Sequence, residues 1–315
     1  MTGTVWVTGA AGFTARHLLD FLAGLAGSAD RPRVVALDIA EAQPPGADAC
    51  HRVDLNDADA VCRVARKEPP RWVVHLAGAM PPASEAQMWL ANVGGTCGLL
   101  AGLAAAGCRD ARVISVSSAA EYHLGSDQPI LETTPLGPCS PYGRTKMGQS
   151  LAALGAGRTF GLETMVVRPF NLIGPGLPSR LVAGRICEQI AASDGEEEIV
   201  LGNTKSARDF VDVRDAVGAY WLLALRGAPG EVYNVCSGRA TSIDEMLTIL
   251  RELTGKALPV RVDGDRIRKT DPAVVVGDAT KLRRATAWEA KLSLRQSLAD
   301  MLAAPASYTA GSAET

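Results

Sequence analysis

The sequence of 315 residues has no cysteine pattern that predicts a disulfide framework or a zinc site. Its seven cysteines are an odd number, and no two of them lie close together. Disulfide-rich domains and zinc sites need closely spaced cysteines, so both classes are excluded. Unpaired thiols are typical of a reducing compartment, and we therefore predict a cytoplasmic protein. The seven are Cys50, Cys62, Cys97, Cys108, Cys139, Cys187 and Cys236.

The sequence also lacks the features of nucleic-acid-binding and membrane proteins. Lys and Arg are scattered and the net charge is −2, so we expect no basic face and no nucleic-acid partner. No apolar run reaches membrane-spanning length, and a strand pattern begins where a signal peptide would stand, so no membrane association is expected. Because His17, His51 and His123 have no carboxylate or cysteine at ligand spacing, no metal is predicted.

What the sequence does contain is a strand, a glycine turn and a helix at its start. An apolar run leads to Gly9 and Gly12, and Phe13 opens a stretch of helical periodicity. Such a turn lets a pyrophosphate approach the backbone, and the helix N-terminus offers unpaired N–H groups to the phosphates. A second strand ends at Asp38, whose carboxylate can accept hydrogen bonds from both adenosine ribose hydroxyls and would repel a 2′-phosphate. This pattern predicts NAD rather than NADP; the alternative is an ordinary turn that binds no nucleotide.

Strands and helices alternate through the first half of the chain. The strands are almost unbroken apolar runs, which is typical of a parallel sheet covered by helices on both faces. The predicted fold is therefore α/β, a doubly wound parallel (Rossmann) sheet, whose ligands bind beyond the carboxyl ends of the strands. Strands are expected to end at Gly9, Asp38, Gly78 and Ser118, so these residues should share one edge of the sheet. The other predicted elements include helices 56–67 and 85–106 and strands 72–77 and 112–116.

A tyrosine and a lysine at helical spacing follow these strand ends. Tyr142 and Lys146 are four residues apart in a helix predicted over about 141–158, so both lie on one face. The pKa of a phenol is about 10, and a neighbouring ammonium lowers it by favouring the phenolate. With Ser118 donating to the same substrate oxygen, the three could move a proton at a carbonyl or alcohol while a nicotinamide moves a hydride. The alternative is an accidental spacing in an ordinary helix.

The alternation loosens after residue 169, which indicates a second domain. We predict a dinucleotide-binding domain over residues 1–169 plus about 212–236. A smaller, sequence-discontinuous substrate domain is predicted over about 170–211 and 237–303. Residues 304–315 have no periodicity and are predicted to form a disordered tail.

Motifs along most of the chain, to about residue 302, point to one family when they are taken together. In the first half they are Thr8–Phe13, Asp54–Leu55, His75–Gly78, Asn92–Thr96, Ser117–Ser118 and Tyr142–Lys146. In the second half they are Arg168–Asn171, Gly174–Gly176, Arg208–Phe210 and the segment around Arg268. This set resembles the extended short-chain dehydrogenase/reductases, which are nucleotide-sugar epimerases, dehydratases and ketoreductases.

The resemblance implies site residues and a homodimer paired through helices 85–106 and 141–158. Guanidinium groups match phosphate oxygens, so Arg208 and Arg268 would hold a nucleotide diphosphate with Asn171, whereas Arg180 is either a further phosphate contact or part of a solvated helix face. The implied cofactor-binding residues are Gly9, Ala11, Gly12, Phe13, Asp38, Asp54, Leu55, Leu76, Ala77, Gly78, Asn92, Tyr142 and Lys146, with Asp54 and Leu55 at adenine. The implied substrate-binding residues are Ser118, Asn171, Arg180, Arg208 and Arg268, and the implied catalytic residues are Ser118, Tyr142 and Lys146.

Within this family the second-half segments are most similar to GDP-4-keto-6-deoxymannose reductases and GDP-mannose 4,6-dehydratases. The dehydratase pattern has a carboxylate two residues after the strand-end Ser or Thr, where this chain has Ala120, with Glu121 one residue later. Dehydration is therefore disfavoured. We predict NAD(P)-dependent hydride transfer to C4 of a 4-keto-6-deoxy sugar on a nucleotide diphosphate, with GDP favoured. The alternatives are an NAD-dependent nucleotide-sugar 4-epimerase or dehydratase and, from another class, a dinucleotide-sensing binding protein.

Overall fold

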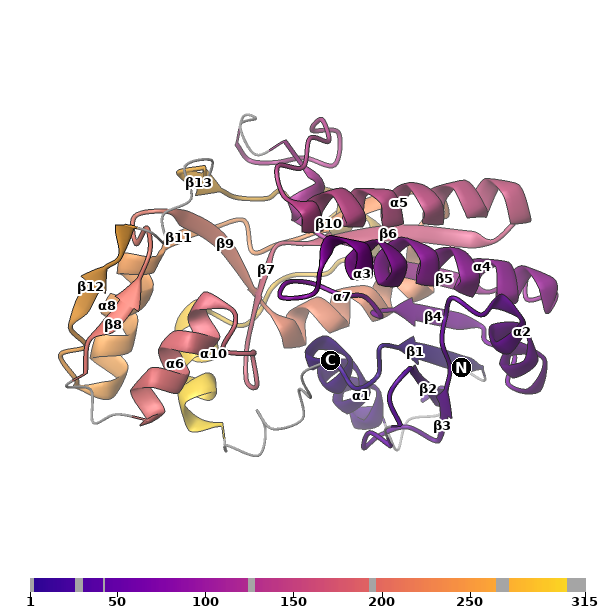
Figure 1. Ribbon diagram of the computed structural model, residues 1–315, viewed down its shortest axis with the longest axis horizontal. Helices are drawn as coiled ribbons and strands as arrows, with labels where there is room; N and C mark the ends of the chain where they lie inside the picture. The colour runs from indigo at the N-terminus through magenta and orange to yellow at the C-terminus, as the bar shows by residue number, and fades with distance from the viewer. Residues whose placement is uncertain are drawn as a thin grey trace.

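The computed structural model describes residues 3–25, 31–41, 43–123, 128–192, 197–264 and 272–304. A larger lobe surrounds a parallel sheet, and a smaller lobe consists of short strands and helices (Figure 1). Arg268 and the tail predicted to be disordered, beyond Ala304, lie outside the described residues.

The larger lobe is built on one seven-stranded sheet. Its strand order is β10-β6-β5-β4-β1-β2-β3, and every neighbouring pair is parallel. The predicted doubly wound α/β fold is confirmed. Because β1 lies centrally with β4 on one side and β2 on the other, the chain reverses direction across the sheet beside the glycine turn. The strands are β1 (Thr4–Thr8), β2 (Arg33–Asp38), β3 (Ala49–Arg52), β4 (Trp72–His75), β5 (Arg112–Val116), β6 (Glu163–Pro169) and β10 (Val232–Val235).

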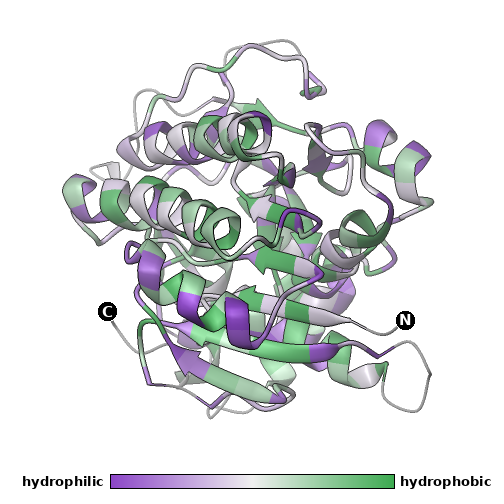
Figure 2. Ribbon diagram, turned by 90° about the vertical axis from the view of Figure 1, so that its right-hand side faces the viewer, coloured by the Kyte–Doolittle hydropathy of each residue, from purple (hydrophilic) through white to green (hydrophobic). Residues whose placement is uncertain are grey.

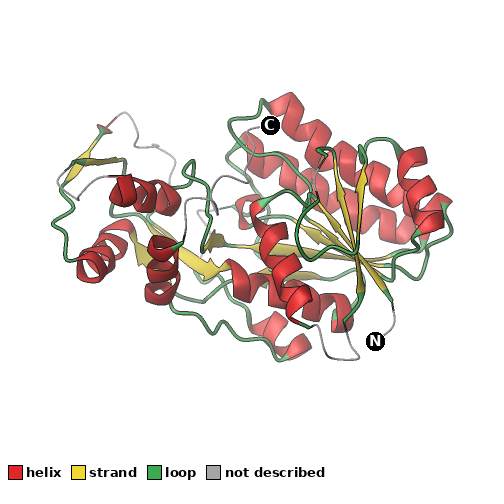
Figure 3. Cartoon of the chain, turned by 90° about the horizontal axis from the view of Figure 1, so that it is seen from below, coloured by secondary structure: helices red, strands yellow, loops and turns green. Residues whose placement is uncertain are grey.

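Both faces of this sheet are covered, which explains the almost unbroken apolar strands. Successive side chains of a strand point to opposite faces, so Val5 and Val7 belong to one core cluster and Trp6 to another. Figure 2 shows the strands mostly green, and Figure 3 shows helices on both sides of them. One face packs against α1 (Phe13–Gly24) and α7 (Val213–Arg226), and the other against α2 (Ala58–Lys67), α4 (Gly95–Ala105) and α5 (Pro141–Phe160).

The long helix predicted over 85–106 contains a π-helical turn. It consists of α3 (Glu85–Trp89), the π-helix η1 (Leu90–Gly94) and α4, without a break. Among the described residues, this 21-residue stretch is long and apolar enough to cross a membrane by length and composition, contrary to the expectation that no run reaches that length. It packs against α2 and α5, with Leu99, Leu100 and Leu103 in the core, as an internal helix of this fold does.

The smaller lobe has its own hydrophobic core. Strand β9 is central in its main sheet, paired with β7, β11 and β13. Helices α6, α8 and α10 supply Ile186, Leu250 and Leu298 to a core cluster separate from those of the larger lobe. The elements are β7 (Asn171–Ile173), α6 (Val182–Ala192), β8 (Ile199–Leu201), β9 (Ala207–Asp212), β11 (Ala240–Ser242), α8 (Ile243–Thr254), β12 (Val260–Val262), β13 (Val274–Val275) and α10 (Leu294–Ala303).

One short segment late in the chain returns to the larger lobe. Helix α9 (Thr280–Thr286) packs against α7 and β10. Leu282 and Trp288 belong to the core cluster of the sheet, and the Trp288 indole N–H donates to the Asp215 carbonyl at 2.9 Å. The domain division stays a prediction, but this segment, assigned by sequence to the substrate domain, packs on the sheet.

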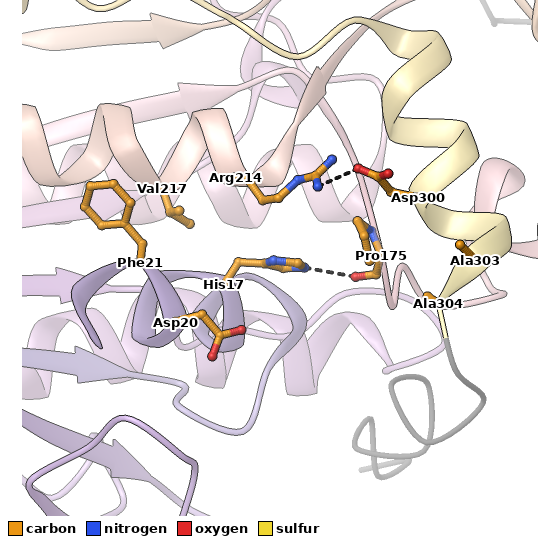
Figure 4. A pocket seen from close by; sticks show the side chains of 9 residues that line it. All are labelled: His17, Asp20, Phe21, Pro175, Arg214, Val217, Asp300, Ala303 and Ala304. Carbon is orange, nitrogen blue, oxygen red and sulfur yellow. Dashed lines mark hydrogen bonds and ion pairs between the residues drawn. The ribbon is translucent and has the colours of Figure 1, made fainter. Parts of the chain in front are cut away.

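The two lobes are joined by a charged cluster. Asp212 is buried and accepts hydrogen bonds from Arg214 at 2.8 Å and from the Ser297 hydroxyl at 2.6 Å, and Arg214 also pairs with Asp300. Beside the cluster lies a cavity of about 500 Å³, where the His17 ring is hydrogen-bonded to the Pro175 carbonyl (Figure 4). The cavity is lined by His17, Asp20, Phe21, Pro175, Arg214, Val217, Asp300, Ala303 and Ala304.

Candidate active site

The glycine turn after β1 has the close backbone approach that the sequence predicts. Gly9 has φ +66°, and a Cβ at this position would lie 2.7 Å from backbone atoms of Ala77. The Gly12 N–H donates to the Gly9 carbonyl at 3.0 Å, and α1 begins at Phe13. The turn therefore leaves the helix N-terminus uncovered by side chains, which fits the pyrophosphate of a dinucleotide.

Asp38 lies beside this turn. Its carboxylate accepts hydrogen bonds from the Ala11 N–H at 2.9 Å and the Ala40 N–H at 3.0 Å, so the end of β2 is fixed to the turn. Each carboxylate oxygen keeps a further lone pair for a ribose hydroxyl. The Val53 N–H donates to the Asp38 carbonyl, which brings the segment of Asp54 and Leu55 to the same edge of the sheet.

A histidine supports the neighbouring strand ends. The His75 ring is fully buried between the Thr8 hydroxyl at 2.8 Å and the Thr96 hydroxyl at 2.9 Å. Burial lowers the pKa of His75 to about 3, so the ring stays neutral. Thr8 Oγ1 also accepts from the N–H groups of Leu76 and Ala77. These contacts give His75 a structural role at the strand ends.

The π-helical turn η1 carries Asn92. Its amide accepts from the Ala79 N–H at 2.7 Å and donates to the Ala79 carbonyl and to the Thr145 hydroxyl at 2.8 Å. π-Helical turns are frequent at functional sites. Asn92 therefore links the segment after β4 to α5, one residue from Lys146.

Ser118 and Tyr142 meet at the carboxyl end of β5. The Ser118 hydroxyl lies close enough to the Tyr142 phenol to lower its pKa, and Ser118 also caps the short 3-10 helix η2 (Ala119–Glu121) by accepting from the Ala120 N–H at 3.1 Å. Ser140 caps α5 through the Gly143 N–H at 3.0 Å, which fixes the first turn of the helix that carries Tyr142. Burial raises the pKa of Tyr142 to about 12, the Glu121 charge acts in the same direction, and the Ser118 hydroxyl opposes both.

Lys146 reaches the same region from the next turn of α5. Its Nζ donates to the Val116 carbonyl at 2.8 Å and to Gln149, and it lies 3.9 Å from the point where a Gly78 Cβ would stand. Burial lowers the pKa of Lys146 to about 8. The sequence predicted that this ammonium lowers the Tyr142 pKa, but that pKa is raised, because Tyr142 is desolvated and the ammonium is engaged with Val116 and Gln149.

The residues predicted to bind the substrate diphosphate are more dispersed. Asn171 is exposed at the start of β7 and pairs with Phe210 of β9. Arg208, two residues earlier in β9, donates to the Ala207 and Pro272 carbonyls. Arg180 extends from the smaller lobe to the Met80 sulfur, 3.6 Å away in the segment after β4. The structure therefore brings Ser118, Tyr142 and Lys146 together more closely than the phosphate-binding set.

Sequence reasoning missed a buried ion pair under this site. Glu121 points inward, where its carboxylate pairs with Arg168 at 3.1 Å. The sequence places Ala120, and not Glu121, at the position of the dehydratase carboxylate. The inward direction of Glu121 is consistent with that prediction. The sequence indicates this ion pair only by a charged residue beside a strand end. The partners are 47 residues apart, so no local pattern predicts their contact.

These features define a class of protein: a dinucleotide-dependent enzyme with a Ser, Tyr and Lys site at the edge of a Rossmann sheet. The NAD dependent epimerase/dehydratase family matches residues 5–236. The chain belongs to this family, and like its members it is an NAD(P)-dependent enzyme.

Two relatives match almost the full length of the chain. The GDP-6-deoxy-D-mannose reductase of Pseudomonas aeruginosa is 32% identical and covers 96% of this chain and 97% of its own. The UDP-glucose 4-epimerase of Streptomyces lividans is 30% identical, over 91% and 92% of the two chains.

The solved structures agree with this assignment. The structure of RMD from Pseudomonas aeruginosa complexed with NADPH superposes with a TM-score of 0.84 at 30% identity, covering 98% of this chain and 99% of that one. A UDP-glucose 4-epimerase from Thermotoga maritima, solved with UDP-glucose, has a TM-score of 0.82 at 26% identity and covers 95% and 97%.

Proposed function

We propose that the protein is a nucleotide-sugar ketoreductase that reduces C4 of a 4-keto-6-deoxy sugar, with a GDP-linked sugar favoured. The observation that carries the proposal is the placement of Ser118 next to Tyr142, with Lys146 on the following turn of α5, at the carboxyl edge of the sheet. The similarity to a GDP-6-deoxy-D-mannose reductase over 96% of the chain supports the substrate class.

Each residue has a distinct task in this reaction. When bound along Gly9, Asp38 and Gly78, the dinucleotide supplies the hydride. Ser118 donates a hydrogen bond to the substrate O4 and orients it. Tyr142, whose pKa is about 12, is protonated at neutral pH and can give O4 its proton. The Lys146 ammonium would hold the hydroxyls of the nicotinamide ribose. Phosphate oxygens of the substrate would be bound by Asn171, Arg180, Arg208 and Arg268.

A 4-epimerase is the rival, because the Streptomyces lividans relative is a UDP-glucose 4-epimerase. An epimerase retains its dinucleotide, whereas a reductase exchanges it in each cycle.

We would denature the purified protein and identify the released nucleotides by mass spectrometry. A site without dinucleotide, together with NAD(P)H oxidation only when a 4-keto sugar nucleotide is added, supports the reductase. Stoichiometric NAD that survives gel filtration, with interconversion of C4 epimers, supports the epimerase. The buried Glu121 argues against the dehydratase.

Asp38 is expected to make the protein prefer NADH over NADPH. Replacing Asp38 with Asn removes the charge that repels a 2′-phosphate and weakens the bonds to the ribose. Hydrogen bonds to charged groups contribute about 1.5–3 kcal/mol, so the KM for NADH should rise about tenfold or more while the KM for NADPH stays or falls. Steady-state kinetics with both cofactors tests this. A wild-type protein that prefers NADPH, the ligand in the related Pseudomonas aeruginosa structure, would contradict it.

Lys146 is expected to give the reaction an alkaline limit. Its pKa is lowered to about 8, so the ammonium is present below that pH and is lost as the pH rises through it. We expect kcat/KM to fall above about pH 8, since this parameter reports the titration of the free enzyme. Lys146→Arg should retain its charge and move this limb to higher pH, whatever its effect on the absolute rate. A limb that does not move would assign the titration to another group.

We also propose a cytoplasmic homodimer without nucleic-acid or membrane partners. Helices α3 to α5, expected by resemblance to pair between subunits, expose Trp89 at 41%, Leu90 at 61% and Leu151 at 58%. Large apolar side chains gathered on one surface are typical of an interface. Light scattering should therefore give twice the mass of the chain, and Leu151→Glu should shift it toward the monomer. A monomeric wild type at micromolar concentration would contradict this proposal.

A further inference from the structure

The Glu121 carboxylate is the centre of a buried polar network under the candidate active site. Glu121 has no exposed surface, and the side chain of Arg168 is 4% exposed. One carboxylate oxygen accepts from the hydroxyls of Ser117 and of Ser150, the latter at 2.7 Å. The other accepts from Arg168 Nε at 3.1 Å. A buried charge is tolerated only when it is paired and hydrogen-bonded, so this carboxylate has a fixed position.

The network adds side-chain bonds between three elements that are already neighbours: β5 and β6 pair in the sheet, and α5 bonds β5 through Lys146. Ser117 follows β5, Ser150 is on α5, and Arg168 belongs to β6. The Arg168 guanidinium also lies 4.7 Å from the centre of the Tyr122 ring, and the Tyr122 hydroxyl donates to Asn234 of β10 at 2.7 Å. Fully satisfied networks of this kind fix the relative position of the elements that they connect.

The same network touches the elements that carry the predicted catalytic residues. Ser117 directly precedes Ser118, and its single hydroxyl hydrogen is shared between the Glu121 carboxylate and the Lys146 backbone carbonyl, which is 3.0 Å from the hydroxyl oxygen. Ser150 lies one turn after Lys146 and two turns after Tyr142 on α5. A shift of α5 against β5 would therefore separate Ser118 from Tyr142 and would first have to break the bonds to Glu121.

We propose that Glu121 is a positioning residue which, with Arg168, holds α5 against the end of β5 so that Ser118, Tyr142 and Lys146 keep their geometry. It acts through these residues and does not face the substrate. The catalytic part of this inference rests on the proposed function. The Glu121 charge also helps to keep both groups in the form that the reaction needs. It raises the pKa of Lys146 and of Tyr142 and so favours the ammonium and the protonated phenol.

The competing explanation is that the pair serves stability alone. Glu121→Gln tests the charge, but it leaves Arg168 buried without a counter-charge and so endangers folding. The double variant Glu121→Leu/Arg168→Met removes both charges, and such replacements are often neutral for stability. Ser117→Ala keeps both charges and removes only the bridge to Lys146. Asp212→Asn alters a carboxylate of similar burial at the lobe junction and controls for a general loss of stability.

Five quantities are measured for each variant: the thermal midpoint, the affinities for NADH and for ADP, kcat, and KM for the 4-keto sugar nucleotide. ADP lacks the nicotinamide ribose that Lys146 would hold, so it reports only the glycine turn and Asp38. In the double variant, NADH affinity should fall about fivefold to tenfold while ADP affinity stays unchanged. Its kcat should fall about tenfold to a hundredfold with little change in KM. Ser117→Ala should lower NADH affinity and kcat in the same way but by smaller factors. Asp212→Asn should change only the thermal midpoint.

Two results separate this inference from the proposed function. Variants that bind NADH as the wild type does and keep its kcat would overturn the positioning role, whatever their thermal midpoints. A wild-type protein that reduces no 4-keto sugar nucleotide would overturn the proposed function. In that case the comparison of NADH with ADP would still decide whether Glu121 positions Lys146.

Discussion

Tyr142→Phe should lower kcat by about 10²–10⁴-fold, the contribution typical of a general acid, and leave NADH affinity nearly unchanged. The substitution removes one oxygen, the one that interacts with Ser118, and keeps the ring at the start of α5. Because the pKa of Tyr142 is about 12, its phenol is the protonated donor that reduction needs at neutral pH. Steady-state kinetics and NADH fluorescence titration measure the two effects.

A second tyrosine provides the control. Tyr233 is buried in β10, and its hydroxyl accepts from the Ala228 N–H at 3.0 Å, away from Ser118. Tyr233→Phe should therefore cost stability without a comparable loss of kcat. If Tyr142→Phe keeps clearly more than about a hundredth of the wild-type kcat, Tyr142 is not the general acid, because that role accounts for at least about a hundredfold. A protein that only senses dinucleotides would bind its ligand unchanged in both variants.

Gly9→Ala should abolish measurable dinucleotide binding and destabilise the fold. A left-handed conformation costs a residue with a Cβ about 1–2 kcal/mol. At Gly9 the added atom would also stand 2.7 Å from backbone atoms of Ala77, and backbone cannot turn aside as a flexible side chain can. The turn must therefore open, and the opening displaces the N–H groups that would meet the pyrophosphate. NADH titration and thermal unfolding measure both consequences.

Gly255 is a matched control for this substitution. It has φ +67° at the end of α8, and a Cβ there would meet nothing within 4 Å. Gly255→Ala should therefore show the cost of the left-handed conformation alone, about 1–2 kcal/mol, with NADH affinity unchanged. Equal behaviour of the two variants would mean that the clash with Ala77 has no effect and that the turn is more adaptable than its geometry indicates.

The parts of the fold that sequence predicts well depend on local patterns. Val5, Trp6 and Val7 are apolar in succession because both faces of the sheet are buried, and the glycines after them mark the turn. Ser118 and Tyr142 could be placed together because the carboxyl ends of parallel strands share one edge. The structure places the two side chains close to each other, while their catalytic roles stay a prediction.

The features that sequence did not predict depend on contacts between distant segments. Glu121 and Arg168 each look like an ordinary charged residue, and only packing of β5, β6 and α5 makes them partners. The direction of Lys146 likewise depends on Gln149 and on the Val116 carbonyl, so helical spacing alone could not predict its effect on Tyr142. The return of α9 to the sheet was missed because its few apolar residues fit either lobe.

The position of α9 limits how this protein can be divided. The matched family region ends at residue 236, yet Leu282 and Trp288 complete the core beside α7. A fragment that stops at residue 236 would expose to water the part of α7 that α9 covers, and should therefore aggregate rather than fold. For the same reason, an exchange of substrate lobes between relatives needs breakpoints on both sides of α9. New substrate specificity is thus more accessible through changes within the smaller lobe than through its replacement as one block.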